Sequence, residues 1–392
     1  MPKRIIIDRA DRLYQMPRST DEFYPRPSIL SGRGVRGARK SGVIDLGRPV
    51  WGGADSRPND ITADSLAPAP EEKIGCLRTA VAEWAARELG VKLNPEREVF
   101  VAPGMRELLS LTGLAFLDPG DLALYPNPGY PAYRQTIITY GAESVAYHLT
   151  EKREFLPRLK QFSERLGRAA RVMFINNPHN PSGAELDMEK FDELLWLAAR
   201  ENLLLINDAA YFAFSGCEDV SLMSSPSGRR IGLEFYSLTF LRCNGKLPIS
   251  FAIGSRDLIS GLRAAGRVRG PELMNYRVDE AIEALNRYPS AELHSLRSRI
   301  RDSWTPALEL CEALGLAPVS RQGFPYLLAR PPRRTSSQSF AATLMRRYGL
   351  VTLPGVAFGD LAEGYVRMAL TGGPLLYQEA LERVQSRKLR AG

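Results

Sequence analysis

Cysteine and histidine are scarce in this chain of 392 residues, which contains four cysteines and three histidines. The cysteines are scattered and form no Cys-x-x-Cys pair, so the sequence suggests neither a zinc site nor a disulfide framework, and we predict no metal. Apolar runs are short, and none approaches the roughly 18 residues that a membrane-spanning helix needs. The apolar stretch Ile5–Ile7 is too short for a secretory signal. We therefore predict a cytoplasmic protein with no membrane association.

Charge is unbalanced, with 52 basic and 44 acidic residues and a formal net charge of +8. The basic residues are dispersed rather than gathered on one face with aromatic residues, so we predict no nucleic-acid partner. Solvated helix faces, or attraction of an acidic small molecule, are the commoner uses of such charge. The hydrophobic content of 44% and the charged content of 24% are those of a soluble globular protein. The length favours one large domain plus a smaller one.

Most of the chain alternates short apolar strands with helices, a pattern that indicates a mostly parallel sheet covered on both faces. Residues 1–45 differ, because they are rich in Arg, Pro, Ser and Gly and predict an amino-terminal arm that contributes contacts to a small domain or a dimer. We predict a large domain over residues 46–285, with strands at 99–102, 122–125, 143–147, 172–176, 203–207, 235–239 and 249–253 and helices at 71–89, 106–116, 131–140, 155–166 and 188–201. Residues 286–392 predict a small α+β domain, with helices at 291–314, 339–348 and 375–388 and strands at 323–328, 350–352 and 365–369.

Four polar clusters lie at or near the predicted strands, and sheets of this kind bind ligands outside the carboxyl ends of their strands. At Gly104–Glu107 a strand-to-helix turn offers backbone N–H groups to an anion. Asn176–Gly183 follows a second strand and is either a tight turn or a binding loop. Asp208 ends a buried strand, where a carboxylate needs a cation or hydrogen-bond donors. Arg367 lies within an apolar strand, where an arginine most often pairs with a carboxylate.

In their order along the chain these clusters resemble the class I/II aminotransferases, which are fold-type I enzymes that use pyridoxal phosphate. The stretch Asn177-Pro178-His179-Asn180-Pro181-Ser182-Gly183 matches that family's Asn-Pro-x-Asn-Pro-Thr/Ser-Gly almost letter for letter. Further matches are Leu77-Arg78, Asp118–Asp121 followed by Pro126–Tyr133, and Pro354–Gly359 followed by Arg367. The resemblance runs from about Leu46 to the end of the sequence. It implies an α/β fold-type I architecture, in which a large domain with a mostly parallel seven-stranded sheet carries a small α+β domain, and it implies a homodimer.

The resemblance also implies contacts to a ligand. Asp208 would face the pyridine nitrogen and keep it protonated, which lets the ring accept electrons. Asn180 and Tyr211 would hydrogen-bond the ring hydroxyl oxygen, and Tyr130 would stack on the ring. Arg367, with Asn180 beside it, would bind the carboxylate of an amino acid or a related small carboxylate. The residues that would surround the phosphate are Gly104, Met105, Ser237 and Thr239.

The chain departs from the family at the cofactor lysine. Phe240 stands where the family has the lysine that holds pyridoxal phosphate as a Schiff base and moves the substrate's α-proton. Pro248 falls where the family has a phosphate-binding arginine, and Met105 where it has a small residue. Lys246, six residues after Phe240, is a candidate substitute for the missing lysine or arginine. Ordinary lysine-dependent transamination is therefore not expected, and we assign no certain catalytic residue.

Three functions stay open. The first is an enzyme of altered chemistry that binds pyridoxal phosphate or pyridoxamine phosphate noncovalently. The second is a cofactor-free enzyme or ligand-binding protein on the same scaffold, and the third is a noncatalytic subunit paired with a competent one. The retained Asp208 and Arg367 favour the first function, whereas Phe240 and Pro248 favour the second because a phosphate dianion needs fixed donors and positive charge.

Overall fold

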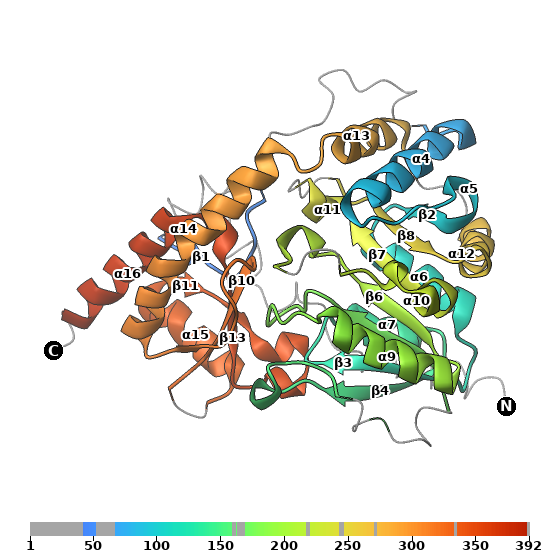
Figure 1. Ribbon diagram of the computed structural model, residues 1–392. Helices are drawn as coiled ribbons and strands as arrows, with labels where there is room; N and C mark the ends of the chain where they lie inside the picture. Colours follow the sequence, from blue (N-terminus) through green and yellow to red (C-terminus); the bar gives the residue numbers. More distant parts are fainter. Residues whose placement is uncertain are drawn as a thin grey trace, which may run out of the picture.

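The computed structural model of the chain describes residues 42–51, 67–158, 162, 169–216, 220–242, 247–269, 273–332 and 335–389. Its centre is a seven-stranded sheet with the strand order β2-β8-β7-β6-β5-β3-β4 (Figure 1). Pairing is parallel from β4 through β3, β5 and β6 to β7, while β8 runs antiparallel to both β7 and β2. The predicted mostly parallel seven-stranded sheet is therefore confirmed. Its strands are β2 (Val99–Ala102), β3 (Leu122–Asn127), β4 (Glu143–His148), β5 (Ala170–Asn176), β6 (Leu204–Asp208), β7 (Gly232–Ser237) and β8 (Ser250–Gly254).

Helices cover both faces of this sheet, which explains why its central strands are nearly continuous apolar runs. On β6, Ile206 packs into one core cluster and Leu205 into the other, because successive side chains point to opposite faces. The Ile206 cluster contains side chains of α6 (Met105–Phe116), α7 (Ala132–Thr139) and α12 (Arg256–Arg269). The Leu205 cluster contains side chains of α4 (Glu71–Glu88) and α9 (Met188–Glu201).

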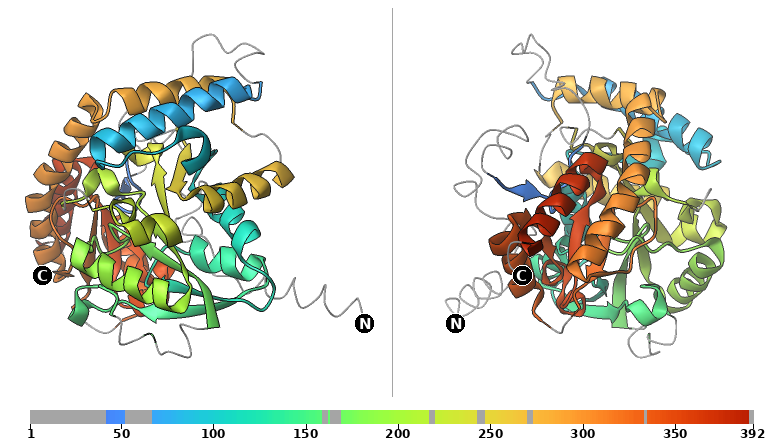
Figure 2. Two further views of the ribbon diagram at one scale, coloured as in Figure 1. Left: turned by 45° about the vertical axis from the view of Figure 1, so that its right-hand side comes forward. Right: turned by 90° about the vertical axis from the view of Figure 1, so that its left-hand side faces the viewer.

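A second, antiparallel sheet has the order β12-β13-β10-β9. Its strands are β9 (Ala317–Pro318), β10 (Tyr326–Arg330), β12 (Leu353–Pro354) and β13 (Val366–Ala369). The long helix α14 (Ala291–Leu314) and the last helix α16 (Pro374–Leu389) run side by side in this part of the molecule, as both views in Figure 2 show. Near them, β1 (Ile44–Asp45) pairs in parallel with β11 (Leu350–Val351), which follows α15 (Ser337–Tyr348). The predicted boundaries between arm, large domain and small domain stay a prediction.

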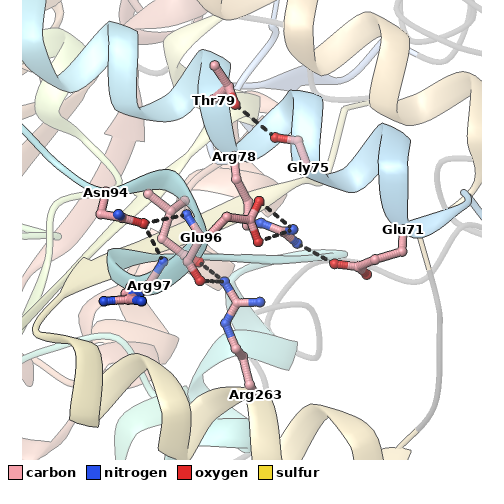
Figure 3. A network of polar contacts seen from close by, with 9 residues as sticks. Glu71, Gly75, Arg78, Thr79, Asn94, Glu96, Arg97 and Arg263 are labelled. Atoms are coloured by element: carbon pink, nitrogen blue, oxygen red, sulfur yellow. Dashed lines mark hydrogen bonds and ion pairs between the residues drawn. The ribbon is translucent and has the colours of Figure 1, made fainter.

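Arg78 and Arg263 together connect three helices beside the β2 edge of the large sheet (Figure 3). The guanidinium of Arg78, only 4% exposed, donates to Glu71 at the start of α4 (2.9 Å) and to Glu96 of α5 (Pro95–Glu98) (2.9 Å). Arg263 of α12 donates to the backbone carbonyl oxygens of Glu96 (2.8 Å) and Val99 (3.0 Å). The buried charge of Arg78 is thus matched by two carboxylates, as a buried arginine requires.

Three of the differences between the predicted and the observed element ends have a clear local cause. The strand expected at 235–239 stops at Ser237, because Ser237 and Ser250 are the last pair of the β7–β8 ladder and α11 (Leu238–Leu241) begins there. The strand expected from 323 starts at Tyr326, after Gly323 with φ 91° and Pro325, which has no N–H for the ladder. The helix expected at 155–166 does not start at Phe155, whose φ is 55°, and most of the rest of that segment lies outside the described residues.

Two long helices were not predicted, α12 and α13 (Asn275–Asn286). The pattern of α12 is interrupted by Gly261 and Gly266, residues that disfavour helix. Both glycines pack against rings: a Cβ on Gly261 would lie 2.9 Å from Phe116 and one on Gly266 would lie 3.3 Å from Phe100. Close helix packing therefore offsets the low helix propensity. In the part of the chain that the structure describes, no helix combines the length and the apolar character needed to cross a membrane.

Candidate active site

A cavity of about 580 Å³ lies at the carboxyl ends of three neighbouring parallel strands. These strands, β5, β6 and β7, end at Asn176, Asp208 and Ser237. Because the carboxyl ends of parallel strands meet at one edge of a sheet, three distant segments place polar side chains around one space. The described wall consists of Pro103, Gly104, Met105, Arg106, Glu107, Tyr130, Asn176, Asn180, Asp208, Ala210, Tyr211, Ser237, Thr239, Phe240 and Pro248.

Asp208 is the buried carboxylate of this wall, with 3% of its surface exposed. One of its oxygens accepts a hydrogen bond from the Tyr133 hydroxyl (2.6 Å), and the other accepts one from the Ala210 backbone N–H (3.0 Å). Burial raises the pKa of Asp208 to about 6, and the two donors offset only part of that effect. Tyr133 is itself fixed, because it is fully buried and its ring stacks on Phe174. The expected partner of Asp208 is thus a pair of donors rather than a cation.

Asn180 and Arg367 form a hydrogen-bonded pair next to the cavity. Arg367 comes from β13 and donates to the Asn180 side-chain oxygen (3.0 Å), while the Asn180 amide donates to the Tyr211 hydroxyl (3.4 Å). The guanidinium carbon lies 3.8 Å from the ring centroid of Tyr326, a cation–π contact that fixes its plane. Arg367 is 5% exposed, and its Nε has no hydrogen-bond partner within the described segments. The arginine therefore keeps unused donor capacity in a buried position.

The segment Asn176–Gly183 is an ordered loop held by its own side chains. Asn176 accepts from the Asn180 backbone N–H (2.8 Å) and donates to the Asp208 carbonyl oxygen (2.8 Å). His179 contacts the Ser182 hydroxyl (2.7 Å) and the Pro128 carbonyl oxygen (2.9 Å), and burial lowers the pKa of His179 to about 4. A neutral ring with both nitrogens in use indicates that His179 holds the loop together and is not a catalytic base.

Phe240 contributes an aromatic face to the wall. It lies on the single helical turn α11, and its ring centroid is 4.5 Å from that of Tyr211 and 5.0 Å from that of Trp51. Beside it, the Thr239 hydroxyl donates to the Leu247 carbonyl oxygen (3.0 Å). Within the described wall there is no lysine. Residue 240 thus offers this cavity an apolar ring and no amine.

On the wall beside α6, the first turn of that helix faces Pro248. Gly104 is the N-cap, and a Cβ placed on it would lie 2.9 Å from the Pro248 carbonyl oxygen, so only glycine fits this approach. Arg106, in the first turn, donates from Nε to the Tyr130 hydroxyl (3.0 Å). Tyr130 also meets Tyr133 edge to face, with ring centroids 5.7 Å apart. Arg106 and Tyr130 therefore form one oriented pair on the wall.

The structure brings most of the predicted site residues together. Arg367 contacts the wall through its hydrogen bond to Asn180. The nine predicted residues that line the cavity are Gly104, Met105, Tyr130, Asn180, Asp208, Tyr211, Ser237, Thr239 and Phe240. Lys246 lies outside the described residues. Sequence reasoning did not single out Tyr133, Arg106 or Trp51. Tyr133 follows Tyr130 by three residues, a spacing that could have placed both near one site, whereas nothing in the sequence connects Trp51 with Phe240.

The chain is similar to a known family and to named proteins within it. The family model described as "Aminotransferase class I and II" matches residues 70–236. The LL-diaminopimelate aminotransferase of Syntrophobacter fumaroxidans is 33% identical over 310 residues, which cover 79% of this chain and 80% of that protein. The chain belongs to the class I and II aminotransferases. Members of this family use pyridoxal phosphate.

Solved structures agree with this assignment. A substrate-bound structure of BacF from Bacillus subtilis has a TM-score of 0.78 and 26% identity, covering 93% of this chain and 95% of that one. The probable N-succinyldiaminopimelate aminotransferase from Thermus thermophilus has a TM-score of 0.77 and 27% identity, covering 90% of this chain and 97% of that one. The fold is thus that of the fold-type I aminotransferases.

The residues of the cavity fit the ring of pyridoxal phosphate. Asp208 is a buried carboxylate on the cavity wall, and such a group can bind a protonated ring nitrogen that balances its charge. The Tyr211 hydroxyl and the Asn180 amide can bind the ring oxygen, and Tyr130 offers an aromatic face. The described wall does not supply an amine for covalent attachment. The fit therefore extends to binding and not to the family's usual anchoring.

Proposed function

We propose that the protein is an aminotransferase-type enzyme that binds pyridoxal phosphate or pyridoxamine phosphate noncovalently and acts on an amino acid or a related small carboxylate. The observation that carries this proposal is the pairing of a buried, donor-held Asp208 with Phe240 on the same wall. A buried carboxylate with a pKa raised to about 6 destabilises the folded protein at neutral pH, which is a cost that a ligand-binding role explains. An aromatic ring at position 240 excludes Schiff-base anchoring at that residue.

Each retained side chain has a role in this proposal. When bound, the cofactor withdraws electrons from an attached amino acid. Asp208 holds the ring nitrogen in its protonated state, and Tyr133 fixes the carboxylate that does so. Arg367 binds the substrate carboxylate, with Asn180 orienting its guanidinium, and its Nε has no other partner within the described segments. Phe240 cannot carry the substrate's α-proton, so another group must do so, and ordinary transamination is not the proposed reaction.

The relatives suggest a class of substrate. Several are named LL-diaminopimelate aminotransferase, and a structural neighbour is named for N-succinyldiaminopimelate. Compounds of this kind carry an α-amino carboxylate, which is the group that Arg367 is suited to bind. We therefore propose diamino dicarboxylic acids as the first substrates to test.

An absorbance titration of the purified protein with each cofactor form tests the proposal. We expect saturable spectral changes with at least one of them. Borohydride treatment followed by intact mass should then show no added cofactor, whereas dialysis of the untreated complex should release it. A reduced adduct mapped to Lys246 would contradict noncovalent binding and restore lysine-dependent chemistry. The absence of any binding would contradict cofactor use altogether.

A second candidate is a cofactor-free enzyme or ligand-binding protein, and it is favoured by Pro248. Pro248 lines the cavity beside Gly104 and Met105, where the resemblance puts the phosphate, and it supplies no positive charge there. This candidate predicts that amino acids or small carboxylates bind through Arg367 without cofactor. Calorimetry with the amino acid alone separates the two functions, because the first predicts binding only after cofactor is added. A noncatalytic subunit would instead copurify with a larger complex.

A further inference from the structure

We infer that Arg106 has taken over the cationic role of the missing arginine and binds the phosphate group of the cofactor. This inference rests on the proposed function and deepens it. Among the described residues of the cavity wall, Arg106 is the one arginine, and the same wall has no lysine. The position at which the family's phosphate-binding arginine is expected holds Pro248. A phosphate dianion in this cavity therefore requires positive charge from another element.

A hydrogen bond to Tyr130 holds the guanidinium of Arg106 on the cavity wall beside the start of α6. Its Nε donates to the Tyr130 hydroxyl at 3.0 Å, so the guanidinium is held next to the ring that is expected to stack on the cofactor. A guanidinium presents five donors in a planar fork, and one bond to Tyr130 sets the direction of the others. The residue lies in the first turn of α6, where the helix dipole adds to the attraction for an anion.

Neighbouring charges also support this role. Glu107, the next residue, lines the same cavity and would repel a phosphate if its charge were unmatched. Arg269 matches that charge through an ion pair at 3.0 Å. Asp208, which also lines the cavity, is suited to the positive ring nitrogen and not to the phosphate. Arg106 and Asp208 thus match the two charged ends of one ligand.

The test compares pyridoxamine phosphate with pyridoxamine, which lacks the phosphate, in binding titrations of the full chain. In the wild type we expect a strong preference for the phosphorylated form. Arg106→Gln should reduce that preference on the order of tenfold to a hundredfold, because a charge-assisted contact is lost, and should leave pyridoxamine binding nearly unchanged. Arg171→Gln is the control: it removes one arginine that pairs with Asp121 and lies outside the described cavity wall, and it should keep the whole preference.

Further variants keep the test decisive. Arg106→Lys retains charge without the guanidinium fork and should keep an intermediate preference, while Tyr130→Phe removes only the orienting contact. If the wild type prefers the phosphate form and Arg106→Gln preserves this preference, the inference is overturned while the proposed function stands. The inference is also overturned if Lys246→Gln, and not Arg106→Gln, abolishes the preference. If the wild type binds neither compound, both the inference and the proposed function are wrong.

Discussion

Asp208 shows how a single residue can favour ligand binding over stability. Its carboxyl group is buried and accepts two hydrogen bonds, yet burial still raises its pKa to about 6 from an ordinary value of 3.8. The folded protein therefore holds a proton more tightly than the unfolded chain between about pH 4 and pH 6. Stability from this group is present at low pH and is lost as pH rises through that window, by up to about 3 kcal/mol for a shift of this size.

Replacing the carboxylate should remove this pH dependence. We expect Asp208→Asn to be more stable than the wild type at pH 7.5 without cofactor, by about 1–2 kcal/mol, and to lose that advantage at pH 4.5. This gain is smaller than the about 3 kcal/mol that the pKa shift represents, because the hydrogen bond from the Tyr133 hydroxyl must rearrange around the amide. Urea unfolding of both proteins at both pH values measures it. A variant that is equally destabilised at both values would show that Asp208 is ionised and fully satisfied in the free protein.

Phe240 gives the second prediction at the residue scale. Phe240→Lys places an amine on the wall of the cavity, where it should form a borohydride-reducible adduct with pyridoxal phosphate that maps to residue 240. The loss of the contacts with Tyr211 and Trp51 should lower stability by about 1–3 kcal/mol. Phe240→Met, which fills the cavity without an amine, is the control. Mass spectrometry that finds no adduct at position 240 would show that this residue does not face the cofactor's carbonyl.

Two helices, α14 and α15, end at glycines of the same conformation that have different neighbouring atoms. α14 and α15 both close on a left-handed glycine, Gly315 with φ 69° and Gly349 with φ 68°. A Cβ on Gly315 would meet only the Pro332 ring at 3.4 Å, whereas one on Gly349 would lie 2.9 Å from the Gly42 carbonyl oxygen. Gly349 therefore also permits the chain of β1 to approach β11.

These two glycines form a matched pair for mutation. We expect Gly315→Ala to cost about 1 kcal/mol, the usual penalty for a left-handed alanine. Gly349→Ala should cost at least about 1 kcal/mol more, because the new methyl group must also displace the backbone at Gly42. Thermal unfolding of both variants checks the difference. Equal costs would mean that the approach of residues 42–45 to α15 contributes little to stability.

For the molecule as a whole, the assembly is predicted to be a homodimer, which is typical of this family. Val268 of α12 is 78% exposed and Met274, which precedes α13, is 43% exposed. Both lie close in sequence to Leu273, which lines a second cavity of about 490 Å³ beside the β2 edge. We therefore choose Val268 and Met274 as the exposed apolar residues with which to test the dimer surface.

A charge at this surface should therefore weaken the dimer. We expect light scattering to give a dimer for the wild type, and Val268→Asp to shift the equilibrium towards monomer without a change in circular dichroism. Trp196→Asp is the control, because Trp196 of α9 is also exposed, at 56%, and α9 packs on the opposite face of the large sheet from α12. A wild-type protein that is monomeric at micromolar concentration would contradict the prediction.

The sequence by itself determined the fold class, the alternation of strands and helices and the ordered motifs around Asn180, Asp208 and Arg367, because periodicity and short motifs are local properties. Only the tertiary structure decided which donors satisfy Asp208, where β7 ends, and that the glycines of α12 stand in a helix. Those outcomes depend on contacts between segments far apart in the chain, and sequence spacing carries no information about such contacts.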